Sequence, residues 1–130
     1  MKLTGDWTGV YDDDGAGDAT PFKAALFDIG GVIWGTTEES GPAGTIIADL
    51  SGMRSGDEVR FTKVYRDAPK GFTDDVNYMG LVSAGGDRIQ GRWEIGFAGV
   101  LGQGPFVMTR QGGQVEKLKL LAEAVVEEEL

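Results

Sequence analysis

Residues 87–96 alternate between two kinds of side chain. One parity is apolar or glycine and the other is charged or polar, namely Ile89, Gly91, Trp93 and Ile95 against Arg88, Gln90, Arg92 and Glu94. Successive side chains of a strand point to opposite faces, so this period of two predicts a β-strand with one buried face. Because similar runs recur along the chain with short glycine- or aspartate-containing breaks, the sequence predicts one antiparallel sheet that closes on itself.

Eight such runs are expected between residues 3 and 110. They cover residues 3–11, 21–28, 32–38, 45–50, 57–67, 74–83, 87–96 and 104–110. The connections are mostly short, which favours an up-and-down meander over a Greek-key sandwich, since a Greek key needs a long crossing connection. We therefore predict an all-β fold, an eight-stranded antiparallel up-and-down barrel.

The period of the apolar pattern changes near the C-terminus. Within residues 114–129, which contain no glycine or proline, apolar side chains recur at steps of three and four, at Val115, Leu118, Leu121, Ala122 and Val125. This spacing predicts an amphipathic α-helix. The chain is expected to divide into a barrel domain, residues 1–111, and a C-terminal helix with an acidic tail, residues 112–130. The helix is expected to pack on the barrel's outside or over one end; a partner-binding or oligomerising helix is the alternative.

Composition argues against several classes of function. The chain has no cysteine and no histidine, which removes disulfides, thiolate nucleophiles, imidazole acid–base chemistry and the common zinc and haem ligands. We predict no metal, no cofactor and no catalytic residue. The net charge of −9 disfavours nucleic acid as a partner. No segment has the ~20 apolar residues of a membrane span or the apolar stretch of a signal peptide, so we expect a cytoplasmic protein without a membrane partner.

Lys63 is the residue most out of place on the predicted inner face. It lies two positions from Phe61 and from Tyr65, on the apolar parity of residues 57–67. A buried ammonium without a partner is costly or loses its proton, so Lys63 requires a carboxylate, a carbonyl or an anionic ligand. A salt bridge at the barrel mouth, with the side chain extending outward, is the structural interpretation. A ligand anchor or a Schiff-base lysine is the functional one.

Aromatic residues of the inner face are candidates for a ligand site. An eight-stranded barrel either fills with side chains or holds one small ligand, and apolar walls with a few polar tips are typical of small-molecule pockets. The candidate ligand-binding residues are Lys63, Tyr65, Tyr78, Trp93 and Tyr11, and Trp34 is a further candidate for the lumen. Plain core packing is the alternative. A cavity above ~300 Å³ would favour a ligand, whereas a filled interior would favour a structural role.

Short motifs resemble the calycin group of barrels, which comprises lipocalins, intracellular fatty-acid-binding proteins and avidins. Gly5-Asp6-Trp7 matches the Gly-x-Trp that opens the first strand in lipocalins and avidins, and Arg110 stands at the end of the last expected strand. The resemblance, which spans residues 3 to 110, implies that Trp7 packs at a closed barrel end with Arg110 lying across it. It does not extend to ligand recognition, because neither the polar ring that binds biotin in avidins nor the full carboxylate clamp of fatty-acid binders has a match.

Three functions stay open at this point. The favoured one is a non-catalytic barrel that binds a hydrophobic or anionic small molecule. The second is an enzyme on a lipocalin-like barrel, of the decarboxylase or cyclase type, in which Lys63, Tyr65, Tyr78 and a glutamate supply the acid–base groups. The third is a structural or interaction module with a filled barrel. A homo-oligomer is compatible with all three.

Overall fold

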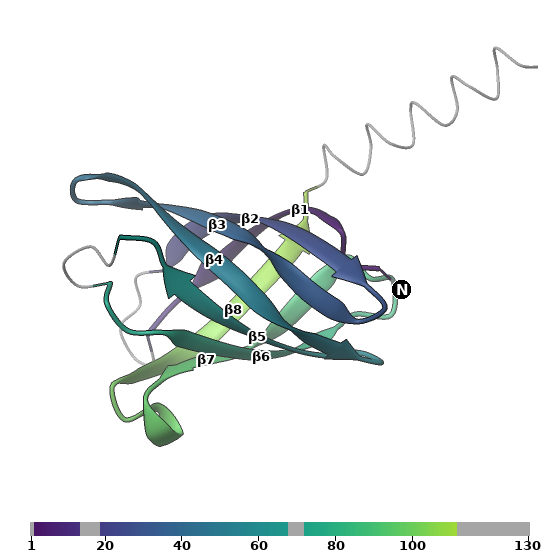
Figure 1. Ribbon diagram of the computed structural model, residues 1–130. Helices are drawn as coiled ribbons and strands as arrows, with labels where there is room; N and C mark the ends of the chain where they lie inside the picture. Colours follow the sequence, from purple (N-terminus) through teal and green to yellow (C-terminus); the bar gives the residue numbers. More distant parts are fainter. Residues whose placement is uncertain (1, 14–18, 68–71, 112–130) are drawn as a thin grey trace, which may run out of the picture.

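The computed structural model describes residues 2–13, 19–67 and 72–111. Eight antiparallel strands follow one another around a closed barrel, with β8 paired to β1 (Figure 1). The strands are β1 (Gly5–Tyr11), β2 (Thr20–Ile29), β3 (Val32–Gly41), β4 (Gly44–Ser55), β5 (Glu58–Tyr65), β6 (Val76–Val82), β7 (Arg88–Ile95) and β8 (Gly102–Arg110). The predicted all-β up-and-down barrel is confirmed. The predicted C-terminal helix and the division at residues 112–130 lie outside the described residues.

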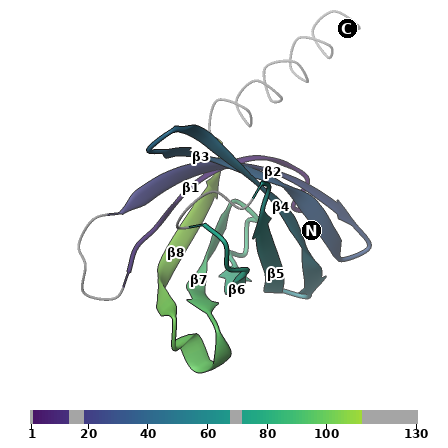
Figure 2. The same ribbon diagram turned by 60° about the vertical axis from the view of Figure 1, so that its left-hand side comes forward.

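The strands surround one interior (Figure 2), and the register with neighbouring strands decides which side chains enter it. The sequence of β6 is apolar on both faces and does not reveal its inner side. In the structure Tyr78 pairs with Phe61 of β5 and with Trp93 of β7, both of which point inward. Tyr78 is therefore buried, while Met79 and Leu81 are exposed.

Several strand ends differ from the expected bounds, and two local features stand out among the differences. The expected run 45–50 continues as β4 to Ser55, although the added residues are mainly polar or glycine. Gly52 permits this, because a Cβ at this position would lie 1.9 Å from the carbonyl oxygen of Arg60 on β5. The connection from β7 to β8 contains a short 3₁₀ turn, η1 (Phe97–Gly99), which the sequence analysis did not predict.

The barrel has two different ends. We call the end where β2, β4, β6 and β8 finish the closed end, and the end where β1, β3, β5 and β7 finish the open end. At the closed end, the Arg110 guanidinium carbon lies 4.7 Å from the centroid of the Trp7 ring. Arg110 also donates hydrogen bonds to the carbonyls of Thr4 (2.7 Å) and Lys2 (2.9 Å). Trp7 is 1% exposed and donates its indole N–H to the Leu3 carbonyl. The contact expected from the motif resemblance is present, and it ties the N-terminal segment to the barrel.

A buried carboxylate, Asp28, holds the same end together. It is 1% exposed, pairs with Arg54 Nε at 2.9 Å, and accepts the backbone N–H groups of Leu3 and Gly31 at 3.0 Å each. Burial alone would raise the pKa of the Asp28 carboxyl, but the hydrogen bonds from Arg54, Leu3 and Gly31 outweigh it and hold the pKa below its usual range. Asp28 is therefore charged in the folded protein at neutral pH.

Candidate functional site

The open end brings all five candidate ligand-binding residues together. A pocket of about 130 Å³ is lined by Tyr11 of β1, Lys63 and Tyr65 of β5, Tyr78 of β6 and Trp93 of β7, together with Phe72, Asp74, Val76 and Ile95. The predicted set thus forms one site from four strands. The volume is well below the ~300 Å³ above which a cavity would favour a ligand, so this criterion is not met and a large ligand has no room in the pocket.

Lys63 lies at the centre of this site. Its side chain is 2% exposed, and Nζ lies 3.3 Å from Oε1 of Glu39. Nζ also lies 4.8 Å from the ring centroids of Tyr11 and Tyr65 and 5.4 Å from that of Tyr78, within the range of a cation–π contact. The expected salt bridge to an acidic residue is present. The expected outward extension of the side chain is wrong, because a carboxylate and three aromatic rings surround the ammonium inside the barrel.

Glu39 is the residue of this site that the sequence pattern did not reveal. Its side chain is 2% exposed and accepts hydrogen bonds from the hydroxyls of Tyr11 at 2.5 Å and Tyr65 at 3.2 Å, in addition to Lys63. The third strand is predicted to end at residue 38, whereas β3 continues to Gly41. With Ile33 and Thr37 buried, the alternation along β3 places residue 39 inside as well. The sequence alone could not supply this signal, because it did not show whether Ile33 or Trp34 faces inward.

Burial and Glu39 together set the ionisation of the site. Desolvation raises the pKa of Tyr11, Tyr65 and Tyr78 well above the usual value for tyrosine, and the negative charge of Glu39 adds to the effect. Desolvation lowers the pKa of Lys63, and Glu39 counteracts it in part. The chain has 3 tyrosines in all, and all of them lie in this cluster. Each is a neutral phenol at neutral pH.

Trp93 is held at the wall of the pocket by a contact that depends on a glycine. Its indole N–H donates to the carbonyl of Asp12 at 2.8 Å, and its ring meets that of Tyr11 edge-on with centroids 6.0 Å apart. A Cβ at Gly104 would lie 1.8 Å from the same Asp12 carbonyl oxygen. Glycine at position 104 therefore lets the chain after β1 approach closely enough to fix the indole.

The interior next to the pocket is filled with aromatic side chains. Phe61 and Tyr78 stack with centroids 4.9 Å apart, and Phe106 meets both rings edge-on. Thr37 is also buried, and its hydroxyl has no hydrogen-bond partner among the described residues. Most of the barrel is thus core, and the pocket is confined to the open end.

Trp34 does not belong to this site, so its assignment to the lumen is wrong. It is 40% exposed on the outer face of β3 and stacks on Phe27 of β2, with centroids 5.5 Å apart. Its side cannot be chosen from the alternation alone, because Ile33 and Trp34 are adjacent apolar residues that point to opposite faces. The register puts Ile33 inside. A hollow of about 590 Å³ also lies on the outer surface, where it is lined mainly by residues of β1, β2, β3 and β8 and does not include Lys63.

Comparison with known proteins leaves the resemblance at the level of architecture. The chain matches no protein-family model, and no curated protein matches it. The closed eight-stranded barrel is consistent with a calycin-like fold. Within the described residues, no three acidic side chains are grouped closely enough to hold a metal ion. The same part of the chain contains no helix long and apolar enough to cross a membrane.

Proposed function

We propose that this protein binds one small, mainly apolar molecule, about the size of a single aromatic ring, in the open-end pocket. The observation that carries the proposal is that a 130 Å³ pocket gathers Lys63, three tyrosines and Trp93. An engineered apolar cavity of about 150 Å³ binds benzene, so a pocket of this size accommodates one ring. A long-chain carrier would need a larger lumen, and the stacked Phe61 and Tyr78 occupy that space.

The polar groups of the pocket favour a ligand that carries one hydrogen-bond acceptor. The Lys63 ammonium has three N–H donors, and Glu39 is its hydrogen-bond acceptor among the described residues. A carbonyl, phenol or carboxylate oxygen on the ligand would accept from Lys63, while the ring packs against the tyrosines and Trp93. Because Glu39 balances the charge of Lys63 and Asp74 lines the pocket, a neutral acceptor suits the site better than a multiply charged anion.

Binding without catalysis fits the ionisation of these groups better than an enzyme does. A general acid or base works best when its pKa lies near the working pH, whereas burial moves the pKa values of all three tyrosines further from neutrality. The carboxylate of Glu39 accepts hydrogen bonds from two of them and from Lys63. Tyr11, Tyr65 and Lys63 are therefore held as donors to Glu39. The pKa of Lys63 moves the other way, toward neutrality, so only the pKa values of the tyrosines disfavour catalysis. The cytoplasmic location and the absence of nucleic-acid and membrane partners remain predictions of the sequence.

Thermal melts with a panel of compounds test the proposal. Phenol, benzaldehyde and benzoate at about 100 times their dissociation constants should stabilise the protein by about 2.7 kcal/mol, which raises the melting temperature by several degrees. A saturated long-chain fatty acid should not. Val76, which lines the pocket and is 4% exposed, provides the blocking variant Val76→Phe, in which the shift should disappear.

Val64→Phe is the matched control, since Val64 is 44% exposed on the outer face of β5. It should keep the full ligand-induced shift. Equal shifts in both variants would mean that the compounds bind elsewhere, and no shift in the wild-type protein with any one-ring compound would reject the proposed function in favour of a structural module.

A further inference from the structure

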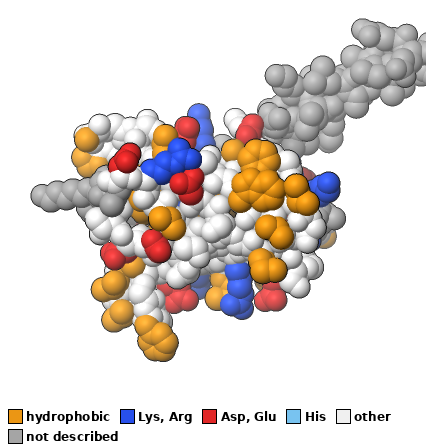
Figure 3. Space-filling view, viewed as in Figure 1, with side chains coloured by type: hydrophobic (Ala, Val, Ile, Leu, Met, Phe, Trp, Pro, Cys, Tyr) orange, Lys and Arg blue, Asp and Glu red, His pale blue; other side chains and the backbone are white. Residues whose placement is uncertain are grey.

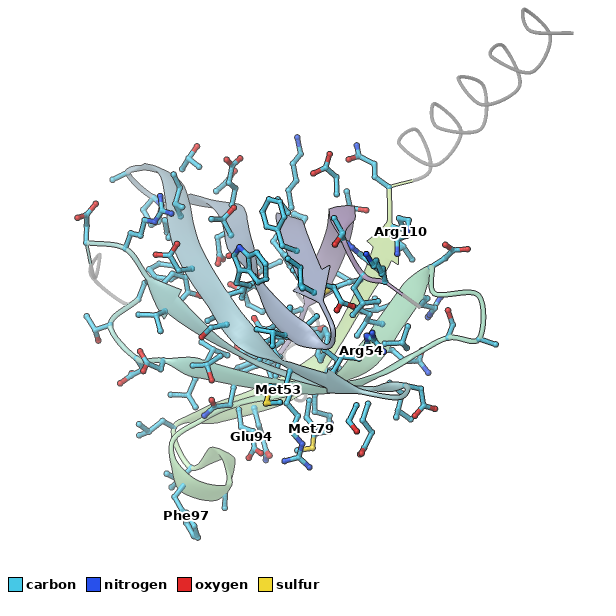
Figure 4. The ribbon with its side chains drawn as sticks, turned by 45° about the vertical axis from the view of Figure 1, so that its right-hand side comes forward. Met53, Arg54, Met79, Glu94, Phe97 and Arg110 are labelled. Carbon is cyan, nitrogen blue, oxygen red and sulfur yellow. The ribbon has the colours of Figure 1, made fainter. Side chains whose placement is uncertain are left out.

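An uncharged apolar patch covers part of the outer wall near the closed end. It consists of Phe27 and Ile29 of β2, Val32 and Trp34 of β3 and Met53 of β4, which are 40% to 67% exposed. We call these five residues the outer patch. They are neighbours in register, since Ile29 pairs with Val32, Val32 with Met53 and Phe27 with Trp34. Hydrophobic side chains gather on this wall in Figure 3, and Figure 4 shows Met53 on the outside of the barrel.

The closed barrel limits how this patch can be covered. Because β1 pairs with β8, the barrel has no strand edge to which another strand could add. A partner must therefore lie on the face of the wall. Contiguous exposed apolar side chains of this kind mark interaction sites.

The end of β8 leads the chain directly to the patch. The N–H of Gln111 donates to the Asp6 carbonyl at 3.0 Å, and Gln111 lines a surface hollow of about 230 Å³ with Ala25 and Thr36. Ala25 and Thr36 pair across β2 and β3. Phe27 and Trp34 are the next outward-facing residues along those two strands. Gln111, the last described residue, therefore lies next to the outer patch.

The sequence that follows has the pattern needed to cover the patch. We propose that residues 114–126 form a helix that packs on the outer patch through its apolar stripe, which comprises Val115, Leu118, Leu121, Ala122 and Val125. In a helix this stripe is about 15 Å long, and three neighbouring strands are about 10 Å across. The stripe therefore covers β2, β3 and β4. Gly112 and Gly113 precede the helix and allow the chain to turn back onto the wall.

Tethering and charge favour this segment over a second copy of the chain. A segment joined to the barrel by a few residues reaches an effective concentration in the millimolar range. A second copy would bring another net charge of −9 to the interface, and like charges oppose association. The outer patch contributes no charge of its own to offset this repulsion.

Quenching of tryptophan fluorescence by acrylamide, a neutral quencher, tests the docking in the full chain. Trp7 and Trp93 are 1% and 5% exposed, whereas Trp34 is 40% exposed when nothing covers it. The wild-type protein should therefore show little quenching. Leu118→Asp, on the apolar stripe, should release the segment and raise the quenched fraction to about one third of the emission, the share of one tryptophan among three. Trp34→Phe in the Leu118→Asp background should abolish that increase.

Leu120→Asp is the matched control, because residue 120 lies on the opposite side of the expected helix from residue 118. It should leave quenching at the wild-type level. Equal quenching of Trp34 in the wild-type protein and in Leu118→Asp would overturn the proposal. So would protection of Trp34 that disappears on dilution together with a dimer in sedimentation, since a second copy would then cover the patch. Neither acrylamide quenching nor sedimentation depends on ligand binding at the open end. Failure of the docking proposal would therefore leave the proposed ligand pocket untouched, and the reverse also holds.

Discussion

Lys63 and Glu39 form an ion pair inside the barrel, with Nζ 3.3 Å from Oε1 and each side chain 2% exposed. If either partner is removed, the remaining charge is buried without solvation by water. The pair therefore matters for stability, and its lysine also lines the pocket, whereas Glu39 lies behind it and does not. Breaking it differs from replacing it, because an uncompensated buried charge is the main cost.

Lys63→Met should lower the free energy of unfolding by about 3–5 kcal/mol, because it leaves the Glu39 carboxylate buried without its cation. The double variant Glu39→Gln with Lys63→Met should recover most of this loss, since glutamine keeps an oxygen that accepts from Tyr11 and Tyr65. Urea unfolding monitored by circular dichroism measures both changes. A single variant as stable as the wild-type protein would show that Glu39 does not need Lys63.

The three tyrosines should make the protein sensitive to alkali. Their folded pKa values are raised, so their contribution to stability is complete below about pH 10, the unfolded pKa, and is lost as the pH rises above it. Lys63 changes stability in the opposite direction, because its folded pKa is lowered and stability therefore rises with pH. This rise ends once lysine in the unfolded chain has lost its proton. Tyrosinate absorbance should appear only as the protein unfolds, whereas urea-unfolded protein should titrate near pH 10. Gradual titration of the folded protein near pH 10 would contradict the buried cluster.

Trp7→Phe should destabilise the protein by about 1–3 kcal/mol, because the Leu3 carbonyl loses its indole donor and Arg110 loses part of its aromatic partner. Ligand affinity should stay unchanged, since Trp7 lies at the closed end. Trp34→Phe, the same substitution on the outer wall, is the control and should cost less. Loss of binding with full stability would assign Trp7 to the binding site instead.

Asp28→Asn should cost about 1–3 kcal/mol at neutral pH, because the amide cannot accept as well from Arg54 and from two backbone N–H groups. The folded pKa of Asp28 is below the usual value of 3.8, so its stabilisation is present above that pH and is lost as the pH falls through the folded pKa. The difference in unfolding free energy between wild type and variant should therefore shrink below about pH 4. Denaturation curves from pH 7 to 3 measure it, and a constant difference would exclude Asp28 as the titrating group.

The alternation of side chains was enough to predict the barrel and much of its interior. Val59, Phe61 and Lys63 on β5, and Ile89 and Trp93 on β7, are buried as that period requires. The alternation does not show which face is buried where two adjacent residues are both apolar, as at Ile33 and Trp34. Such positions depend on register with the neighbouring strands, which is a long-range property of the sheet.

The site was predicted in part for the same reason. Lys63 is conspicuous because a cation interrupts an apolar parity, and this anomaly pointed to the pocket. Glu39 is not conspicuous, since it follows Glu38 in a polar stretch at the end of a strand. Its role arises because only β4 separates β3 from β5 in the barrel, so that Glu39 meets Lys63 and Tyr65 on the inner face. No local sequence pattern encodes this contact. The small volume of the pocket likewise depends on how Phe61, Tyr78 and Phe106 pack together.

The tryptophan indole N–H signals in a nitrogen–proton correlation spectrum test the central claim most directly. The three indoles lie in three places, with Trp93 at the pocket, Trp7 at the closed end and Trp34 on the outer wall. Titration with phenol should shift the Trp93 signal in a saturable manner, leave Trp7 and Trp34 in place, and lose its effect in Val76→Phe. A Trp93 signal that does not move at saturating concentrations of any one-ring compound, or a shift confined to Trp34, would contradict a ligand site at the open end.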